Sequence, residues 1–319
     1  MIPMSIDIAW DDQRAFLAVL DGGSLSAAAR ALGWAQPTVR ARIEALEHAL
    51  GAKLFTRSPG GLTPTDQARA LGPHVRAMRF ASEAFRRAAS APPGEVAGTV
   101  RLAVSEFVGL EVLPPMLARL RTAHPSLSVE VDLSNASSDL MGQEADVAVR
   151  MYPPRQGGLV ARKVGTVQLG FFAHRDYAAR RGLPATADEL ADHDLIGPDR
   201  ARADLALAER VGPALARERL ALRTDSHPAQ LAAVRAGVGI GAVQRPVGLA
   251  DPRLVPVLPD LVLAELGYWV VTHEDLRAAP RVRAAFDHLV EEFGRYVSGP
   301  GKRKRPTLSD RPEVLGEDA

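Results

Sequence analysis

The fold of this chain is decided by the stretch from Ser24 to Arg57, SLSAAARALGWAQPTVRARIEALEHALGAKLFTR. Ser24 opens a first helix because its side-chain oxygen can cap the free N–H groups there. That helix is expected to end near Gly33, since glycine suits the left-handed residue that follows a helix. A second helix is predicted from about Gln36 to Leu50, with Pro37 in its first turn, where a missing N–H costs least. Two short helices joined by a tight connection predict a helix-turn-helix.

The second helix has one apolar and one polar face. Its apolar residues recur at spacings of four, three and four and form one buried stripe. These residues are Val39, Ile43, Leu46 and Leu50. Arginine and glutamine on the other face are side chains that bond guanine and adenine through paired contacts, so we expect this face to bind DNA. The alternative is an ordinary helical hairpin with a solvated polar face. The residues expected at DNA are Ser24, Ser26, Gln36, Pro37, Thr38, Arg40, Arg42 and Arg57.

The same stretch resembles the LysR-type transcriptional regulators. The resemblance is carried by Phe16-Leu17-Ala18-Val19, Ser24-Leu25-Ser26-Ala27-Ala28-Ala29, Gln36-Pro37, Ile43, Leu46-Glu47, Leu50-Gly51 and Leu54-Phe55-Thr56-Arg57. The chain departs from the family pattern at Ala35, where a helix-capping serine is usual and whose loss typically costs about 1 kcal/mol. It also departs at Arg40 and Arg42, where serine and glutamine are common. These extra cations are expected to strengthen phosphate attraction or alter base preference, so the family's operator preferences are not carried over.

Composition narrows the class of protein. The 319 residues predict two or three domains, and a hydrophobic fraction of 46% is enough for a sizeable core. No apolar run approaches the length of a membrane span, and the start shows no basic segment followed by an apolar one, so we expect no membrane partner and no secretory signal. The absence of cysteine rules out disulfides and thiolate chemistry. These features predict a cytoplasmic protein.

Charge is concentrated where DNA binding is expected. The net charge of the chain is only +1, but residues 24–60 hold five cations and two glutamates, which leaves +3 on a small surface. After this module, Lys53-Leu54-Phe55 predicts a short strand, and Arg57-Ser58-Pro59-Gly60-Gly61 predicts the tip of a wing. Arg57 is expected to contact phosphate, the alternative being a solvated cation. A further helix, Ile8 to Leu20, is expected to pack behind the two helices.

A long helix is predicted to follow the wing. Thr63-Pro64-Thr65-Asp66 has a capping threonine, a proline in the first turn and an acid at the third position, and the helix runs to about Ala89. One stripe of this helix is apolar: Leu71, Val75, Met78, Ala81 and Phe85. We expect it to pair with a copy of itself, as the linker helix does in LysR-type dimers. The alternative is packing on its own domain.

The predicted secondary structure changes from helical to mixed after Ala91-Pro92-Pro93-Gly94. Strands and helices then alternate at intervals that argue for a parallel sheet in an α/β domain. Strands are predicted at 99–104, 127–133, 145–150, 167–173, 240–243 and 268–272, and helices at 109–123, 139–142, 229–236 and 280–296. Five short pieces resemble the LysR effector-binding domain: Leu113-Pro114, Ala145–Arg150, Tyr177 with Gly182-Leu183-Pro184, Leu190 with His193, and Ala236–Ile240.

The resemblance implies the complete architecture. We expect an N-terminal all-α winged helix-turn-helix domain with a long linker helix, then a two-lobed α/β effector-binding domain resembling type 2 periplasmic binding proteins. The expected ranges are 7–62 for the DNA-binding domain, 63–90 for the dimerisation helix and 95–297 for the effector domain. Lobe I is expected at 95–166 and 269–297, lobe II at 167–268, and crossover strands near 165–169 and 267–271. The charged tail, 298–319, is expected to be disordered; its basic cluster Lys302–Arg305 is either a weak DNA contact or simply solvated.

No catalytic constellation is visible in the sequence. The eight histidines are dispersed, which argues against a zinc site, and the nucleophile-elbow, P-loop and dinucleotide motifs are missing. We therefore expect no enzyme activity and no cofactor, but an unidentified small-molecule effector. In open α/β sheets, ligands bind beyond the carboxyl ends of strands, near helix N-termini. The residues expected to line such a cleft are Ser105, Glu106, Phe107, Asn135, Arg150, Met151, Ser226, His227 and Gln244.

Individual roles in this cleft remain open. Ser105 and Ser226 are expected to cap helices and to donate to an anionic or carbonyl ligand. Glu106 is either a cleft residue or a helix-start acid, which the helix dipole favours. Arg150 either neutralises Glu106 or is a structural partner at a strand end.

The sequence thus predicts a ligand-responsive transcriptional regulator that binds an inverted-repeat operator as a dimer or tetramer. Its expected partners are double-stranded DNA and further copies of itself, with RNA polymerase as an additional candidate. The alternatives are a periplasmic-type solute-binding protein, which would carry an export signal, and an enzyme fused to a DNA-binding module.

Overall fold

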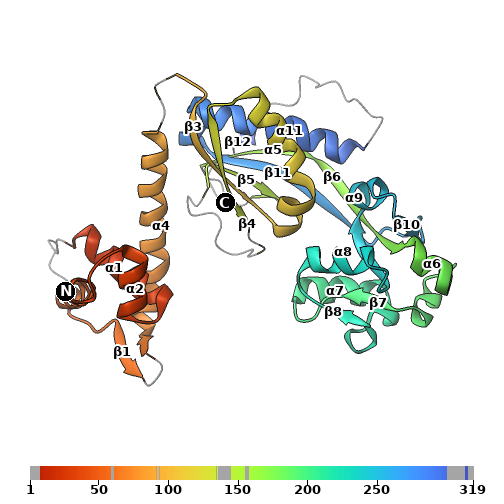
Figure 1. The fold of residues 1–319 in the computed structure, drawn as a ribbon, viewed down its shortest axis with the longest axis horizontal. Helices are drawn as coiled ribbons and strands as arrows, with labels where there is room; N and C mark the ends of the chain where they lie inside the picture. Colours follow the sequence, from red (N-terminus) through yellow and green to blue (C-terminus); the bar gives the residue numbers. More distant parts are fainter. Residues whose placement is uncertain are drawn as a thin grey trace. The chain divides into compact units, whose positions relative to one another are not determined.

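A computed structural model describes residues 8–58, 61–90, 92, 94–133, 135, 145–154, 158–299 and 313–314 (Figure 1). The chain divides into two compact units, the first ending at Arg86 and the second beginning at Arg87. Three sequence predictions lie outside the described residues: the wing tip at Pro59-Gly60, the short helix 139–142 and nearly all of the tail.

The first unit is a helical bundle with a two-stranded wing. It contains α1 (Trp10–Gly22), α2 (Leu25–Leu32), α3 (Gln36–Leu50), β1 (Phe55–Ser58), β2 (Gly61–Pro64) and α4 (Asp66–Ala88). The predicted helix-turn-helix is confirmed, and α3 has the predicted bounds. Phe16, Val39 and Leu54 are completely buried in its core, whereas Leu50, expected on the same stripe, is only partly buried.

Local chemistry explains where these helices start and stop. Ser24 Oγ accepts a hydrogen bond of 3.1 Å from the Ala27 amide, as predicted for a cap. Gly33 and Gly51 end α2 and α3 in the left-handed conformation, with φ of +67° and +63°. Ala35 precedes α3 without a side-chain cap, so the expected loss of that interaction is present.

The wing and the start of α4 differ from the prediction. The strand begins at Phe55 rather than Lys53, and Thr63 and Pro64 belong to β2 instead of a helix. The reason is that Thr63 pairs with Thr56 across the wing. The helix is capped by the next threonine, because Thr65 Oγ1 accepts a 3.2 Å bond from the Ala68 amide.

The apolar stripe of α4 divides into two parts. Leu71 and Val75 pack against the core of the first unit. Further along, Met78 is 45% exposed and Phe85 is 75% exposed. The alternative of packing on its own domain is therefore correct for the first part of this helix. The second part has no apolar cover within the chain's described residues, and its pairing with a second copy stays a prediction.

The second unit is built on a sheet whose strand order is β4-β3-β5-β11-β6-β9-β7-β8, with β10 and β12 also paired to β6. The strands are β3 (Gly98–Val104), β4 (Leu127–Leu133), β5 (Val147–Arg150), β6 (Leu159–His174), β7 (Leu195–Gly197), β8 (Leu222–Arg223), β9 (Ile240–Gln244), β10 (Leu254–Val257), β11 (Ala264–His273) and β12 (Glu313–Val314). The expected parallel sheet is only partly correct. β3 runs parallel to β4 and β5, and β7 to β8 and β9, but β6 and β11 are antiparallel to their neighbours.

The two crossover strands are confirmed. β6 and β11 pair with each other from Leu169 opposite Ala264 to Leu159 opposite His273, with a register shift at Tyr268/Trp269. They connect lobe I, built on β3–β5, with lobe II, built on β7–β10 (Figure 1).

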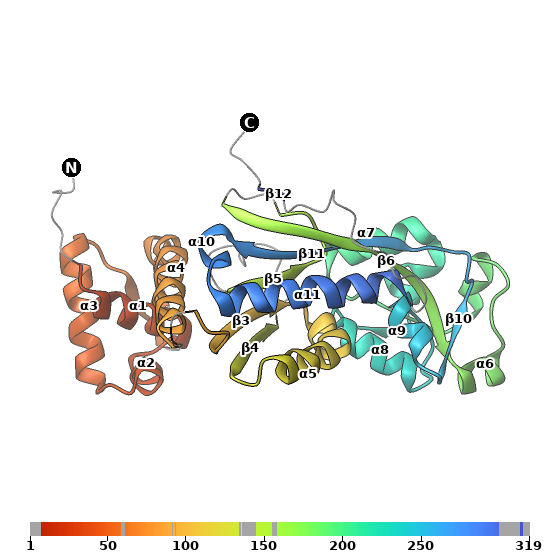
Figure 2. The same cartoon turned by 90° about the horizontal axis from the view of Figure 1, so that it is seen from above.

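Helices cover the faces of both lobes. Lobe I has a π-helical turn (Val108–Val112), α5 (Leu113–Ala123), α10 (Glu274–Arg277) and α11 (Pro280–Ser298). Lobe II has α6 (Arg175–Arg181), α7 (Arg202–Val211), α8 (His227–Arg235) and α9 (Arg245–Ala250), of which only α8 was predicted. Short 3-10 turns at 188–192, 213–215 and 217–219 complete lobe II. Figure 2 shows α5 and α11 side by side on one face of the sheet.

Candidate DNA-binding surface and effector cleft

The N-terminal half of α3 presents the predicted polar surface. Gln36, Pro37, Thr38 and Arg40 are all exposed. Arg42 is different, because its guanidinium donates to the Asp12 carboxylate of α1 at 3.2 Å and its side chain is only 42% exposed. Arg40, unlike Arg42, can therefore contact DNA without first breaking an internal ion pair.

The remaining predicted DNA contacts lie on α2 and the wing. Ser26 is exposed, whereas the Ser24 hydroxyl already caps α2 and is half-buried. Arg57 lies exposed on β1, where its backbone pairs with Leu62.

Glu47 joins α3 to the wing and was missed as a functional residue. Its Oε1 accepts hydrogen bonds from the Leu54 and Phe55 amides at 2.9 and 3.3 Å, and Oε2 accepts one from Lys53 at 2.5 Å. Burial raises the pKa of this carboxyl, but the Lys53 ammonium and the two amides outweigh burial and lower it. A signal was present in the sequence, because Glu47 lies four residues after Ile43 and so near the buried stripe.

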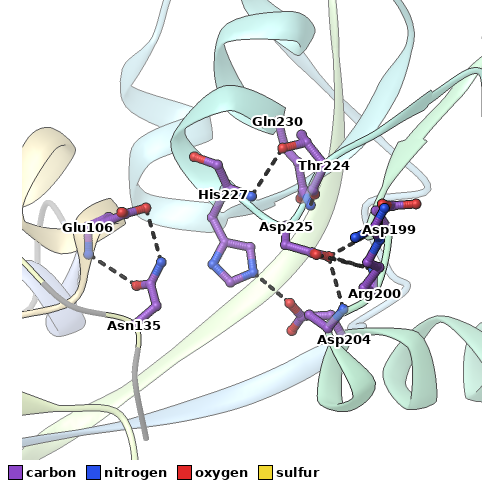
Figure 3. A network of polar contacts seen from close by, with 11 residues as sticks. Glu106, Asn135, Asp199, Arg200, Asp204, Thr224, Asp225, His227 and Gln230 are labelled. Carbon is purple, nitrogen blue, oxygen red and sulfur yellow. Dashed lines mark hydrogen bonds and ion pairs between the residues drawn. The ribbon is translucent and has the colours of Figure 1, made fainter. Parts of the chain in front are cut away.

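The lobe I side of the cleft lies at the carboxyl end of β3 (Figure 3). Ser105 Oγ accepts a 3.4 Å bond from the Val108 amide and so caps the helical turn, as predicted. The Glu106 amide donates to Asn135 Oδ1 at 3.2 Å, and Asn135 Nδ2 donates to Glu106 Oε2 at 3.1 Å. Phe107 is buried in the hydrophobic core and supports this corner from behind.

The lobe II side lies at the start of α8. His227 Nε2 is 3.0 Å from Asp204 Oδ2 on α7. This bond raises the pKa of His227 against the effect of burial, and the charges of Asp204, Glu106 and Asp225 raise it further. The Glu106 carboxylate of lobe I therefore interacts electrostatically with the His227 imidazole of lobe II (Figure 3).

Asp225 organises the adjoining loop. Its carboxylate accepts bonds of 2.8, 2.9 and 3.0 Å from the amides of Asp199, Arg200 and Ala201, which lower its pKa. Ser226 does not cap α8 through its hydroxyl, contrary to the prediction. Its amide instead donates to Thr224 Oγ1 at 3.2 Å, which fixes the loop.

The other three predicted cleft residues are part of the supporting structure. Arg150 is buried and donates to the backbone oxygens of Ala103 and Val149 at 3.3 and 3.1 Å, which supports its alternative as a structural partner at a strand end. Gln244 is buried and bonds Met151 Sδ at 3.8 Å. Its Oε1 also accepts bonds from Tyr268 and Tyr296.

Among the described residues, no three histidine, aspartate or glutamate side chains gather in a way that could hold a metal ion. No described helix is both long and apolar enough to cross a membrane.

These features define a class: a winged helix-turn-helix module joined by a long helix to a two-lobed α/β domain. Two family models match the chain. Residues 10–69 match the bacterial regulatory helix-turn-helix protein of the lysR family, and residues 93–294 match the LysR substrate binding domain. The chain belongs to the LysR family of transcriptional regulators.

Individual relatives agree with this assignment. The HTH-type transcriptional regulator PtxR of Pseudomonas aeruginosa is 30% identical over 88% of this chain and 92% of its own length. An HTH-type transcriptional regulator of Xanthomonas campestris is 31% identical, but the match covers 57% of this chain and only 53% of that protein. The chain likewise spans 59% of the Mau operon transcriptional activator of Paracoccus denitrificans. The crystal structure of CbnR, a LysR family transcriptional regulator, covers 89% of this chain and 99% of its own with a TM-score of 0.65 at 20% identity, which shows the shared fold.

Proposed function

We propose that this protein regulates transcription by binding an inverted-repeat operator as a dimer or as a tetramer built from two dimers, and that a small molecule adjusts this binding. The observation that carries the proposal is the exposed N-terminal half of α3, since recognition helices contact base edges with this part. A full-length structure of CbnR has been solved with its target DNA, which supports the same use of the module here. Acting on DNA requires a cytoplasmic location, where RNA polymerase is a candidate partner.

We propose that α4 forms the dimer contact. Met78 and Phe85 project from its second part with 45% and 75% of their surface exposed, and burial of such side chains is a main source of association energy. A dimer would place two α3 helices in major grooves about one helical turn apart, or a multiple of it.

The effector is proposed to bind between Ser105, Glu106 and Asn135 of lobe I and Ser226 and His227 of lobe II, with Met151 and Gln244 at the back. Phe107 and Arg150 then position the cleft without touching the ligand. An effector changes DNA binding only through its different affinities for two arrangements, typically about 1–3 kcal/mol.

The DNA proposal is tested by footprinting the purified protein on DNA flanking its gene and then measuring affinity for the protected fragment. Arg40→Ala is expected to lower operator affinity by about 1–3 kcal/mol, because it removes a contact without disturbing an internal bond. Arg42→Ala produces the same loss if Arg42 leaves Asp12 to bind a base. Equal loss on operator and random DNA would make either residue a phosphate contact, and a fragment that is never protected would reject the proposal.

The effector proposal is tested with a reporter gene under the footprinted operator. Ser105→Ala is expected to abolish the response to cell extract or growth medium that contains the effector, while leaving DNA binding in place. Thr122→Ala, a matched hydroxyl removal on the exposed surface of α5, is the control. An unaltered response in Ser105→Ala would show that the effector binds elsewhere.

A further inference from the structure

A concave surface lies away from the residues proposed to bind the effector. It has a volume of about 840 Å³ and is lined by α5, α9, α11 and the loop 251–253. None of the nine predicted cleft residues lines it. The helices that form it can be followed in Figure 2. Its volume falls in the range of about 300–1,000 Å³ that small-molecule sites occupy.

The two walls of this groove belong to different lobes. α5 and α11 form the lobe I wall, and α9 with the following loop forms the lobe II wall. Arg235, at the end of α8, bonds across the lobes to both Glu111 carboxylate oxygens at 2.9 and 2.8 Å. It also donates to Asp251 of its own lobe at 2.9 Å. A molecule seated in the groove would therefore touch both lobes beside the ion pair that joins them.

The lining combines an apolar surface with arginines. Pro115, Ala250 and Pro252 are exposed apolar residues of the lining, and they offer contact for a hydrocarbon body. Buried Val112, Met116 and Val247 lie behind them. Three further arginines stand at the rim: Arg119, Arg253 and Arg295, with 52%, 56% and 59% of their side chains exposed.

These rim arginines retain capacity for another anion. Arg253 bonds Asp251 through Nε and one Nη, and Arg119 bonds Glu292 in the same manner. A guanidinium has five donors in a planar fork, so such a two-point contact leaves further donors toward solvent. With Arg235 the lining holds four arginines and the three carboxylates Glu111, Asp251 and Glu292, while Arg295 also bonds Glu291, which is not part of the lining.

We propose that this groove is a second ligand site, which binds a small amphipathic carboxylate with its hydrocarbon body against α5 and α9 and its carboxylate on the rim arginines. Because the walls belong to both lobes, the bound molecule favours the lobe arrangement described here over any other. The site goes beyond the proposed effector cleft and does not depend on it.

One side chain connects the two places. Tyr296 lines the groove, and its hydroxyl donates to Gln244 Oε1 at 2.7 Å. Gln244 in turn contacts Met151, a residue proposed for the back of the cleft, at 3.8 Å. Buried Gln244 thus connects Tyr296 of the groove with Met151 of the proposed cleft.

The test uses three probes with one carbon skeleton: 4-phenylbutyrate, 4-phenylbutan-1-ol and 4-phenylbutylamine. Calorimetric titration of the full-length protein at pH 7.5 is expected to give the tightest binding for the carboxylate, by about tenfold over the amine. Ala250→Trp, which fills the groove from an exposed lining position, is expected to weaken this binding at least about tenfold. Leu249→Trp is the matched control, because Leu249 is 66% exposed and does not line the groove.

Several outcomes overturn the proposal. Equal affinity for the three probes would show that the arginines do not bind the carboxylate. Undiminished binding in Ala250→Trp would show that the probe binds elsewhere, for example in the proposed effector cleft. Equal weakening by Leu249→Trp would point to a general disturbance of α9. Arg119→Gln, which leaves the groove open, provides a second variant and is expected to weaken the carboxylate but not the alcohol. If sedimentation shows that Ala250→Trp changes the assembly state instead of probe binding, the groove is a protein contact.

Discussion

The two polar surfaces of this protein are organised in opposite ways. On α3, the side chains of Gln36, Thr38 and Arg40 are exposed and form no hydrogen bond or ion pair with other described residues. In the cleft, Glu106 is bonded to Asn135 and His227 to Asp204. If the two surfaces act as we propose, a nucleic acid contacts α3 without displacing internal partners, whereas an effector meets side chains that their neighbours already hold in place. Exposed side chains without internal bonds are suited to a polyanion, and fixed side chains are suited to the selection of one compound.

The largest expected effect is a loss of stability in the unit that carries α3, while the unit that carries the proposed cleft is unaffected. Phe16→Ala removes a completely buried ring from the helix-turn-helix core and is expected to cost about 3–5 kcal/mol. Scanning calorimetry of the full chain should show a lowered transition for the first unit and an unchanged one for the second. Leu249→Ala, an exposed apolar truncation, is the control, and a uniform shift of both transitions would contradict independent units.

A smaller effect is expected at the support of the wing. Glu47→Gln replaces a buried carboxylate that accepts from two amides and Lys53, at a cost of about 1–3 kcal/mol. Since folding lowers the pKa of Glu47, its contribution is present above the unfolded-state pKa and is lost as pH falls through the lower folded-state value. Urea unfolding between pH 7 and pH 3 should therefore show a shallower loss of stability in Glu47→Gln. An identical pH profile in both proteins would reject this role.

The corresponding effect in the cleft is weaker, because the His227 side chain is 43% exposed. Folding raises the pKa of His227, so the stabilisation by Asp204 is fully present below the ordinary histidine pKa and is lost as pH rises through the higher folded value. Asp204→Asn is expected to lower the His227 pKa measured by NMR and to cost at most about 1 kcal/mol below pH 6. Asp176→Asn beside His174 serves as the control. An unmoved His227 titration would contradict the pairing.

The smallest effects compare two serines that precede helices. Ser24→Ala removes an observed cap and is expected to cost about 1 kcal/mol, whereas Ser226→Ala removes a hydroxyl that caps nothing and should stay within about 0.5 kcal/mol. Chemical denaturation of both variants measures the difference. Equal costs would mean that the Ser226 hydroxyl has an unrecognised partner.

The sequence predicted most where a residue and its partner are close along the chain. The bounds of α3, the cap at Ser24 and the strand Leu127–Leu133 follow from spacing and capping rules that act within a few residues. The cleft predictions identified the strand ends and the Ser105 cap, but missed the partners of Glu106 and His227. Asp204 lies 23 residues before His227, and no local pattern specifies that they meet.

The same limit explains the two misassigned roles. Ser226 resembles a cap by position, but the Thr224 hydroxyl takes its amide and orients the loop differently. The start of α4 was displaced by two residues because Thr63 and Thr65 both satisfy the capping pattern. Only the pairing of Thr63 with Thr56 in the wing decides between them.

The paired crossover strands determine which relative motions of the two lobes require little energy. β6 and β11 are hydrogen-bonded to each other as they pass from one lobe to the other, so this two-stranded ribbon can twist without breaking the bonds between its strands. The ladder is weakest at Val164, the extra residue of the bulge opposite Tyr268/Trp269. Its neighbour Gly165 has φ of +147°, and a Cβ there would lie 2.5 Å from Val297. We therefore expect the lobes to move relative to each other by a change in the twist of this ribbon, with the close packing of Gly165 on Val297 preserved.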